Sequence, residues 1–96
     1  MSLYFVQHRH NENTCPAKDP QMGAMLLQHL SRTNARTYGI QLQGEAVLDG
    51  AHTLVLILEA EQQEQVERFI QPFQQAGSVE IHPASLCEVV VERKSC

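Results

Sequence analysis

The stretch EAVLDGAHTLVLILEA, residues 45–60, decides the fold that the sequence predicts. Asp49-Gly50 is a strong hairpin-turn signal, because both residue types tolerate a positive φ. Residues 40–48 before the turn alternate between two faces, and Gly44 among them is typical of a β-bulge. Residues 52–59 after the turn form a nearly continuous apolar run, which indicates a strand buried on both sides. The centre of the chain is therefore predicted to be a β-hairpin.

Two predicted helices flank this hairpin. Asp19-Pro20 is a helix start, with Asp as the N-cap and Pro at the first helical position. The apolar stripe that follows is predicted to pack on a sheet and consists of Met22, Met25, Leu26 and Leu30. Residues 62–76 form the second helix, whose buried positions are predicted to be Val66, Phe69, Ile70 and Phe73. Pro72 predicts a kink or an early end near Gln71.

The first and last strands lie near the two ends of the chain. Residues 3–10 alternate and are rich in strand-forming residues, and residues 78–82 form a short strand ended by Pro83. After it, a capping-box pattern from Ser85 to Glu88 favours a helix, whereas the Val89–Val91 triplet favours a strand. The sequence leaves these two alternatives open for the terminal segment.

This order of elements is βαββαβ, which predicts a single α+β domain over residues 1–96 with a ferredoxin-like fold. Right-handed crossovers place both helices on one face of a four-stranded antiparallel sheet, with the first and third strands in the centre. Leu54, Leu56 and Leu58 project to one side of the third strand, and Val55 and Ile57 project to the other. Because two helices cover only one face, we expect an exposed leucine ridge and a sheet-to-sheet homodimer.

Several segments together resemble small members of the dimeric α-β barrel superfamily. They are YFVQH at residues 4–8, EAVLDGAHTLVLILEA, FIQPF at 69–73 and SVEIHPA at 78–84. The resemblance implies a ferredoxin-like dimer with a site between the sheet and the first helix, or between the paired sheets. That superfamily holds haem- and polyketide-handling enzymes, monooxygenases of quinol-like substrates and many proteins without a known activity, so it implies no single chemistry.

Composition excludes several classes of function. The net charge is −4, and the seven Lys and Arg residues form no basic patch that would bind nucleic acid. No apolar run approaches the length of a membrane span, and no signal peptide is visible, so a cytoplasmic location is expected. Three cysteines fit no paired spacing and are expected to be reduced thiols, with a bridge from Cys15 to Cys87 or Cys96 as the alternative.

The histidines carry the most specific chemical signal. His8 and His10 are two residues apart on one predicted strand, so their imidazoles project to the same face about 6–7 Å apart at Cα. Imidazole is a common ligand for zinc, copper and iron. The predicted strand order brings His82 and His52 within reach, and Cys15 follows shortly after His10. The sequence therefore predicts five candidate metal ligands, namely His8, His10, His82, His52 and Cys15.

Three functions remain open at this point. The first is a homodimeric binding module that holds a small ligand or a partner at its sheet face. The second is a metal-binding protein or metalloenzyme that uses His8 and His10. The third is a metal-free, monooxygenase-like enzyme in which one of these histidines is a base oriented by Glu45 or Glu80. The sequence does not decide whether the protein is an enzyme.

Overall fold

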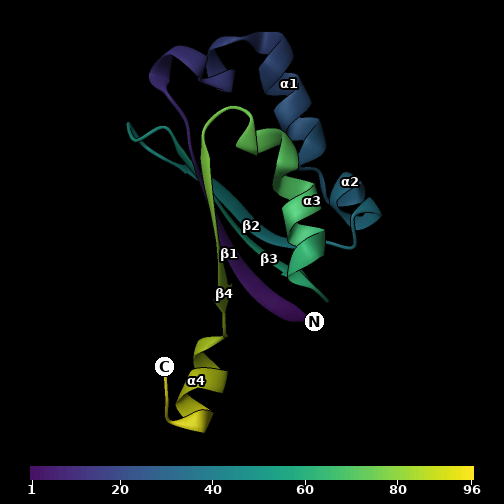
Figure 1. Cartoon of the computed structure of the whole chain (residues 1–96), viewed down its shortest axis with the longest axis vertical. Helices are drawn as coiled ribbons and strands as arrows, with labels where there is room; N and C mark the ends of the chain where they lie inside the picture. Colours follow the sequence, from purple (N-terminus) through teal and green to yellow (C-terminus); the bar gives the residue numbers. More distant parts are fainter.

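A computed structural model describes all 96 residues and shows a four-stranded antiparallel sheet with helices packed on one side (Figure 1). The strands are β1 (Ser2–Arg9), β2 (Gln41–Leu48), β3 (Thr53–Ala60) and β4 (Ser78–Ala84). Their order in the sheet is β2-β3-β1-β4, so β1 and β3 lie in the centre. The predicted α+β class with a four-stranded antiparallel sheet is confirmed.

The β2–β3 hairpin forms where the sequence predicts it. The register shifts between Leu42 and Gly44, which confirms the irregularity expected near Gly44. Gly50 takes a left-handed φ of 73° in the turn. Position 52 is also left-handed, although it is a histidine, with a φ of 48°. The turn therefore uses two left-handed residues, only one of which is glycine.

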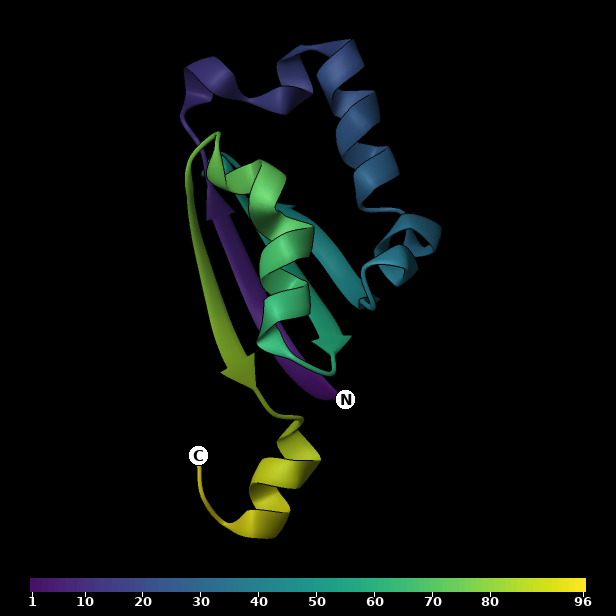
Figure 2. The same cartoon turned by 45° about the vertical axis from the view of Figure 1, so that its right-hand side comes forward.

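The helices are α1 (Pro20–His29), α2 (Arg32–Thr37), α3 (Gln63–Gln74) and α4 (Cys87–Arg93). Figures 1 and 2 show α1, α2 and α3 on the same side of the sheet. Contacts with the sheet come from α3, which packs on β3 and β4, and from α2, which packs on β2. The terminal segment is a helix, which settles the alternative left open by its sequence.

The leucine side of β3 forms the core beneath α3. Leu54, Leu56 and Leu58 are only 6%, 1% and 0% exposed, so the prediction that this ridge is exposed is wrong. The leucines are buried rather than exposed because α3 packs its apolar stripe on this face of the sheet. The uncovered face carries Val55 and Ile57 instead, and Ile57 is 45% exposed.

The apolar stripe of α1 does not pack on the sheet as predicted. Met22 and Met25 are 46% and 64% exposed, and α1 has no buried residue. The reason is the connection from β1, which forms two short 3-10 turns, η1 (Glu12–Thr14) and η2 (Pro16–Lys18). The helix packs against η2 and α2, so its first turns are held away from the sheet.

Neither internal proline ends its element. α3 continues past Pro72 to Gln74, so the predicted early end is wrong. The carbonyl that Pro72 leaves without a helical donor belongs to exposed Arg68, where water can satisfy it. β4 continues through Pro83, which pairs with Tyr4. A missing N–H is tolerated there because β4 is an edge strand.

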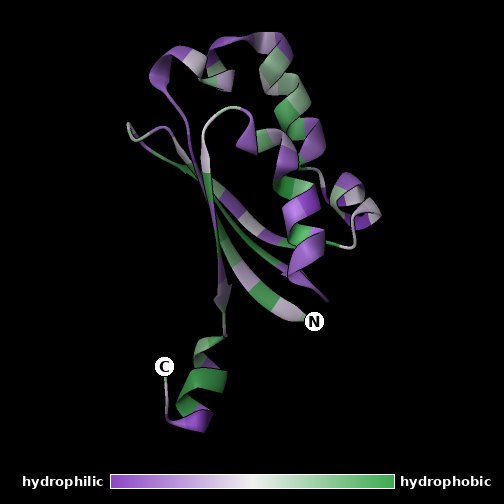
Figure 3. Cartoon of the chain, viewed as in Figure 1, coloured by the Kyte–Doolittle hydropathy of each residue, from purple (hydrophilic) through white to green (hydrophobic).

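The terminal helix α4 stands apart from the sheet, beyond the end of β4 (Figures 1 and 2). It contains no buried residue, and its N-cap is Leu86 without a side-chain cap, so the predicted capping box is absent. Much of it is hydrophobic (Figure 3). None of the helices in the chain has the length and apolar character needed to span a membrane.

Candidate metal centre

His8 and His10 lie side by side on the helix-covered face of β1, at the end of the sheet nearest the β2–β3 turn. His8 is only 3% exposed, and its ring centroid lies 5.3 Å from that of Phe73 on α3. The His8 and His10 rings are stacked with 5.5 Å between centroids. The alternation of side chains along β1 places both imidazoles on one face, as predicted.

His52 reaches this pair from the neighbouring hairpin. The His10 backbone N–H donates a 3.0 Å hydrogen bond to the His52 carbonyl oxygen, which fixes the two residues to one another. Their rings meet edge to face with 5.3 Å between centroids. The left-handed backbone of His52 is uncommon for a residue with a Cβ, and such conformations cluster at functional sites.

Cys15 completes the cluster from the loop that follows β1. It lies between η1 and η2, where the Asn11 side chain caps η1 by accepting a 2.9 Å bond from the Asn13 N–H. The loop folds back so that ligand atoms of His10, Cys15 and His52 all lie within 4.8 Å of one another. We call these three residues the donor triad.

Ring nitrogens of His8 and His10 are buried without polar partners. Both ring nitrogens of His10 and Nε2 of His8 are buried and have no hydrogen-bond partner. A buried polar atom left unsatisfied costs about 1–3 kcal/mol, so three of them on two neighbouring residues require an explanation. A bound ion that accepts a lone pair explains one nitrogen of an imidazole, whose other nitrogen then carries the proton.

Burial also favours the neutral form of these histidines. Desolvation, followed by the charge of His10, lowers the pKa of His8, while the Phe73 backbone opposes this change. Desolvation, followed by the charge of His52, lowers the pKa of His10. A neutral imidazole has a free lone pair, so both residues are held in the form that binds metal ions.

The donor triad borders a cavity of about 230 Å³ between the sheet, the β2–β3 turn and the loop that holds Cys15. Its lining is largely apolar and includes Leu26, Leu54 and Phe73. His8 also lines it. The four candidates His8, His10, His52 and Cys15 are thus brought together around one cavity.

The fifth candidate, His82, is separated from the others. It pairs with Phe5 across β1 and β4, on the opposite face of the sheet from His8. There its ring lies 6.3 Å from that of Phe5, and its Nε2 lies 3.7 Å from a Glu80 oxygen. The prediction of His82 as a ligand with His8 and His10 is wrong, because the two sets project from opposite faces.

The same geometry removes Glu80 as an orienting acid for His8 or His10, and no hydrogen bond joins Glu45 to either histidine.

Figures 1 and 2 show α4, which carries Cys87, at the opposite end of the molecule from η1 and η2. A bridge from Cys15 to Cys87 or Cys96 is therefore incompatible with this structure.

His29, which the sequence did not single out, has a structural role. Its Nε2 donates a 2.7 Å hydrogen bond to the Phe69 carbonyl oxygen, and its ring stacks on Phe69 with 4.7 Å between centroids. The Asn34 side chain donates to the His29 carbonyl at 2.8 Å. This histidine therefore attaches the end of α1 to α3. The only sequence feature that pointed to this packing role was the position of His29 beside the apolar stripe of the helix.

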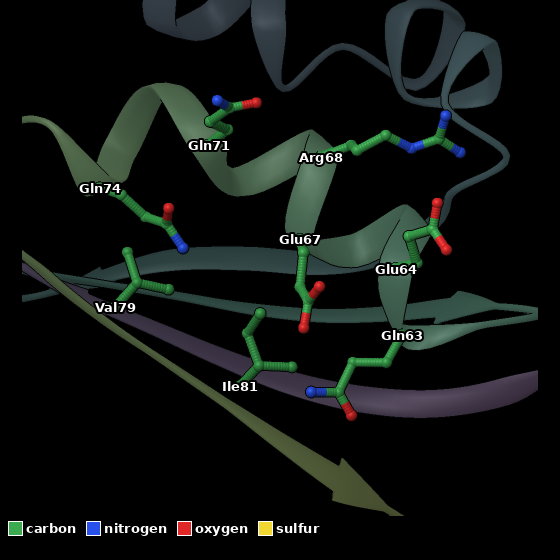
Figure 4. A pocket seen from close by; sticks show the side chains of 8 residues that line it. All are labelled: Gln63, Glu64, Glu67, Arg68, Gln71, Gln74, Val79 and Ile81. Atoms are coloured by element: carbon green, nitrogen blue, oxygen red, sulfur yellow. The ribbon is translucent and has the colours of Figure 1, made fainter.

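A second hollow, of about 440 Å³, lies between α3 and β4 (Figure 4). Glu67 and Gln74 extend from α3 toward Val79 and Ile81 of β4, whereas Arg68 points away from the strand. This hollow contains no histidine or cysteine, and its polar groups form the exposed face of α3. It offers no donor set comparable with the triad.

Comparison with protein-family models and with curated proteins finds no match for this chain.

Proposed function

We propose that this protein binds a transition-metal ion through His10, Cys15 and His52. The observation that carries the proposal is the convergence of their ligand atoms within 4.8 Å of one another. An unpartnered ring nitrogen of His10 supports it independently, because one nitrogen of a neutral imidazole offers its lone pair to an ion. Three separate segments, namely the end of β1, the η1–η2 loop and the β2–β3 turn, supply one donor each.

The donor types favour zinc or copper. Two imidazoles and one thiolate form a borderline-to-soft set, whereas magnesium and calcium prefer oxygen ligands. Around a tetrahedral zinc ion with bonds of about 2.0–2.3 Å, neighbouring ligand atoms are about 3.3–3.8 Å apart. The donor triad needs to contract by no more than about 1.5 Å to reach this spacing. Two of its members lie in a loop and a turn, where such a movement is least costly.

Three protein ligands leave a fourth position, which is the arrangement of catalytic rather than structural zinc sites. His8 lies next to this position, since its ring stacks on His10 and it lines the same cavity. It supplies the fourth ligand in a closed site. In an open site, a water or a ligand takes the position and His8 faces it.

Titration with cobalt and zinc tests the metal site. Protein stripped of metal is expected to bind one Co²⁺ per chain and to develop a thiolate-to-cobalt charge-transfer absorption. Zn²⁺ is expected to displace the cobalt. Cys15→Ser should abolish that absorption, and His10→Ala should weaken affinity at least about 100-fold, since even residues behind the ligands contribute about 10–100-fold.

Two matched variants act as controls. Cys87→Ser removes an exposed thiol, and His82→Ala removes an exposed imidazole, both remote from the donor triad. Neither is expected to change affinity. Cobalt binding without the charge-transfer absorption, or equal losses in Cys87→Ser and Cys15→Ser, would contradict the proposed site.

We further propose that two chains associate through their uncovered sheet faces. This face carries Phe5, Val55 and Ile57, and no helix of the same chain packs on it. The strand order, with helices on one side only, supports a ferredoxin-like fold. Together with the apolar face it supports the resemblance to the dimeric α-β barrel superfamily.

The terminal helix supports the same association. α4 has seven residues and none is buried, while Val89 and Val91 are 43% and 74% exposed. Isolated helices shorter than about 12–15 residues are marginal in water, so α4 needs a packing surface. A second chain supplies one, because no element of the same chain makes an extensive contact with this helix.

Light scattering tests the dimer. The expected mass is twice the 10.8 kDa of one chain. Ile57→Lys places a charge in the middle of the apolar face and is expected to shift the protein toward monomer. Leu27→Lys, on the exposed side of α1, replaces a comparable apolar residue outside that face and is expected to leave the mass unchanged. A mass of 10.8 kDa at every concentration would refute the dimer.

A further inference from the structure

An apolar groove lies between α1 and α3, with a volume of about 530 Å³. Met22, Met25 and Leu26 line it from α1, and Pro72 and Phe73 line it from α3. These are the α1 residues whose sequence pattern predicts packing in a core, yet two of them are about half exposed or more. The apolar stripe of α1 therefore faces the apolar residues of α3 across an open groove, and no side chain of the chain fills the groove.

The groove adjoins the cavity at the donor triad. His8, Leu26 and Phe73 line both hollows. A molecule lying in the groove therefore has its inner end beside the proposed ion. The volume of the groove falls within the range of about 300–1,000 Å³ that is usual for small-molecule sites.

His8 is the polar group at the junction of the two hollows. It is 3% exposed, and its Nε2 has no hydrogen-bond partner. A polar atom held in an apolar lining without a partner is costly, whereas ligand sites combine apolar walls with a few such atoms. This junction therefore has the composition of a ligand site rather than of an imperfectly packed core.

The net charge of the proposed metal site determines which chemical group of a ligand would bind the ion. A divalent ion bound by two neutral imidazoles and one thiolate keeps a net charge of +1, so a singly charged anionic group complements it. The methionines and Phe73 along the groove suit a flexible aliphatic or aromatic tail, since methionine adapts to irregular apolar shapes.

We propose that the groove binds a small amphiphile, with its apolar tail between α1 and α3 and an anionic oxygen head group at the metal beside His8. This inference rests on the proposed metal site for the head group, but the groove itself does not depend on the ion. The tail and the head are therefore tested separately.

Calorimetry with two hydroxamates tests the zinc-loaded protein. Acetohydroxamate has the head group alone, and octanohydroxamate adds six methylene groups. Because each buried methylene contributes several-fold, octanohydroxamate is expected to bind about 100-fold more tightly even if the tail is only half buried. Equal affinities for the two probes would overturn the groove.

Two substitutions on α1 locate the tail. Met25→Gln keeps the length of the side chain at a position that is 64% exposed, so the fold is expected to tolerate it. It should weaken octanohydroxamate several-fold and leave acetohydroxamate unchanged. Leu27→Gln, which is outside the groove, is the matched control and should change neither. Equal weakening by both variants would contradict the assigned position of the tail.

Binding of 1-octanol to metal-free protein separates the two proposals. This probe needs no ion, so saturable binding that Met25→Gln weakens would support the groove even if zinc does not bind. Failure of zinc binding together with octanol binding would overturn the metal site and the placement of the head group, but not the groove. Absence of octanol binding would overturn the groove.

Discussion

A Gly77→Ala variant is expected to lose about 3 kcal/mol of unfolding free energy. Gly77 joins α3 to β4 with a φ of 155°, and a Cβ placed there would overlap the Arg9 carbonyl oxygen. The added carbon would also lie 3.1 Å from Nε2 of His8. Because the main obstacle is backbone of the central strand β1, relief requires moving β1 or the α3–β4 turn. Strain of this kind is among the larger single-residue effects.

Gly50→Ala is the matched control for this substitution. Gly50 is also left-handed, with a φ of 73°, but no atom lies within 4 Å of an added Cβ. Only the conformational cost of about 1–2 kcal/mol applies. Urea unfolding at one protein concentration measures both variants. Equal losses in the two would show that the close approach at Gly77 contributes nothing.

A Leu56→Ala variant is expected to lose about 2–5 kcal/mol, because it leaves a cavity in the centre of the core. Leu56 is 1% exposed and lies in β3 between its paired neighbours Val6 and Glu45. The upper part of the range applies if the surrounding side chains cannot collapse into the space. Thermal or urea unfolding gives the value directly.

Leu27→Ala removes the same atoms from a position that is 67% exposed on α1. Its expected effect is within about 0.5 kcal/mol, as for most surface substitutions. The pair therefore compares buried and exposed leucines with identical chemistry. A large loss in Leu27→Ala would show that α1 is packed against something, either the sheet or a second chain.

The local part of the fold was predictable from the sequence because its signals are local. Asp49-Gly50 specifies a turn by its conformational preference, and Asp19-Pro20 starts α1 where expected, with the Asp19 side chain accepting from the Gln21 N–H at 2.9 Å. Alternation along β1 placed His8 and His10 on one face. These features depend on residues that are neighbours in the chain.

The face of each strand was not predictable in the same way. β3 is apolar on both sides, so its pattern did not show which side α3 would cover, and the leucine side became the core. The same ambiguity applied to β4, where His82 and Val79 alternate without an indication of which faces β1's histidines. The exposed position of α1 depends on the two 3-10 turns before it, which composition alone did not reveal.

The candidate site was therefore predicted in part. His8, His10, His52 and Cys15 were named from residue type and order, and the structure brings them together. The left-handed backbone of His52 had no specific sequence signal, because only a few per cent of non-glycine residues adopt a positive φ, although histidine is enriched among them.

That backbone has a kinetic consequence for the proposed site. His52 lies beside the tip of a hairpin, and local opening at such a place needs far less free energy than separating the central strands. A non-glycine residue held left-handed adds a cost of about 1–2 kcal/mol that opening releases. Opening of this turn would thus release His52 from the proposed ion while His10 stays on the paired strand β1. Uptake and release of the ion would then be governed by the opening rate of one turn, with β1 and β3 remaining paired throughout.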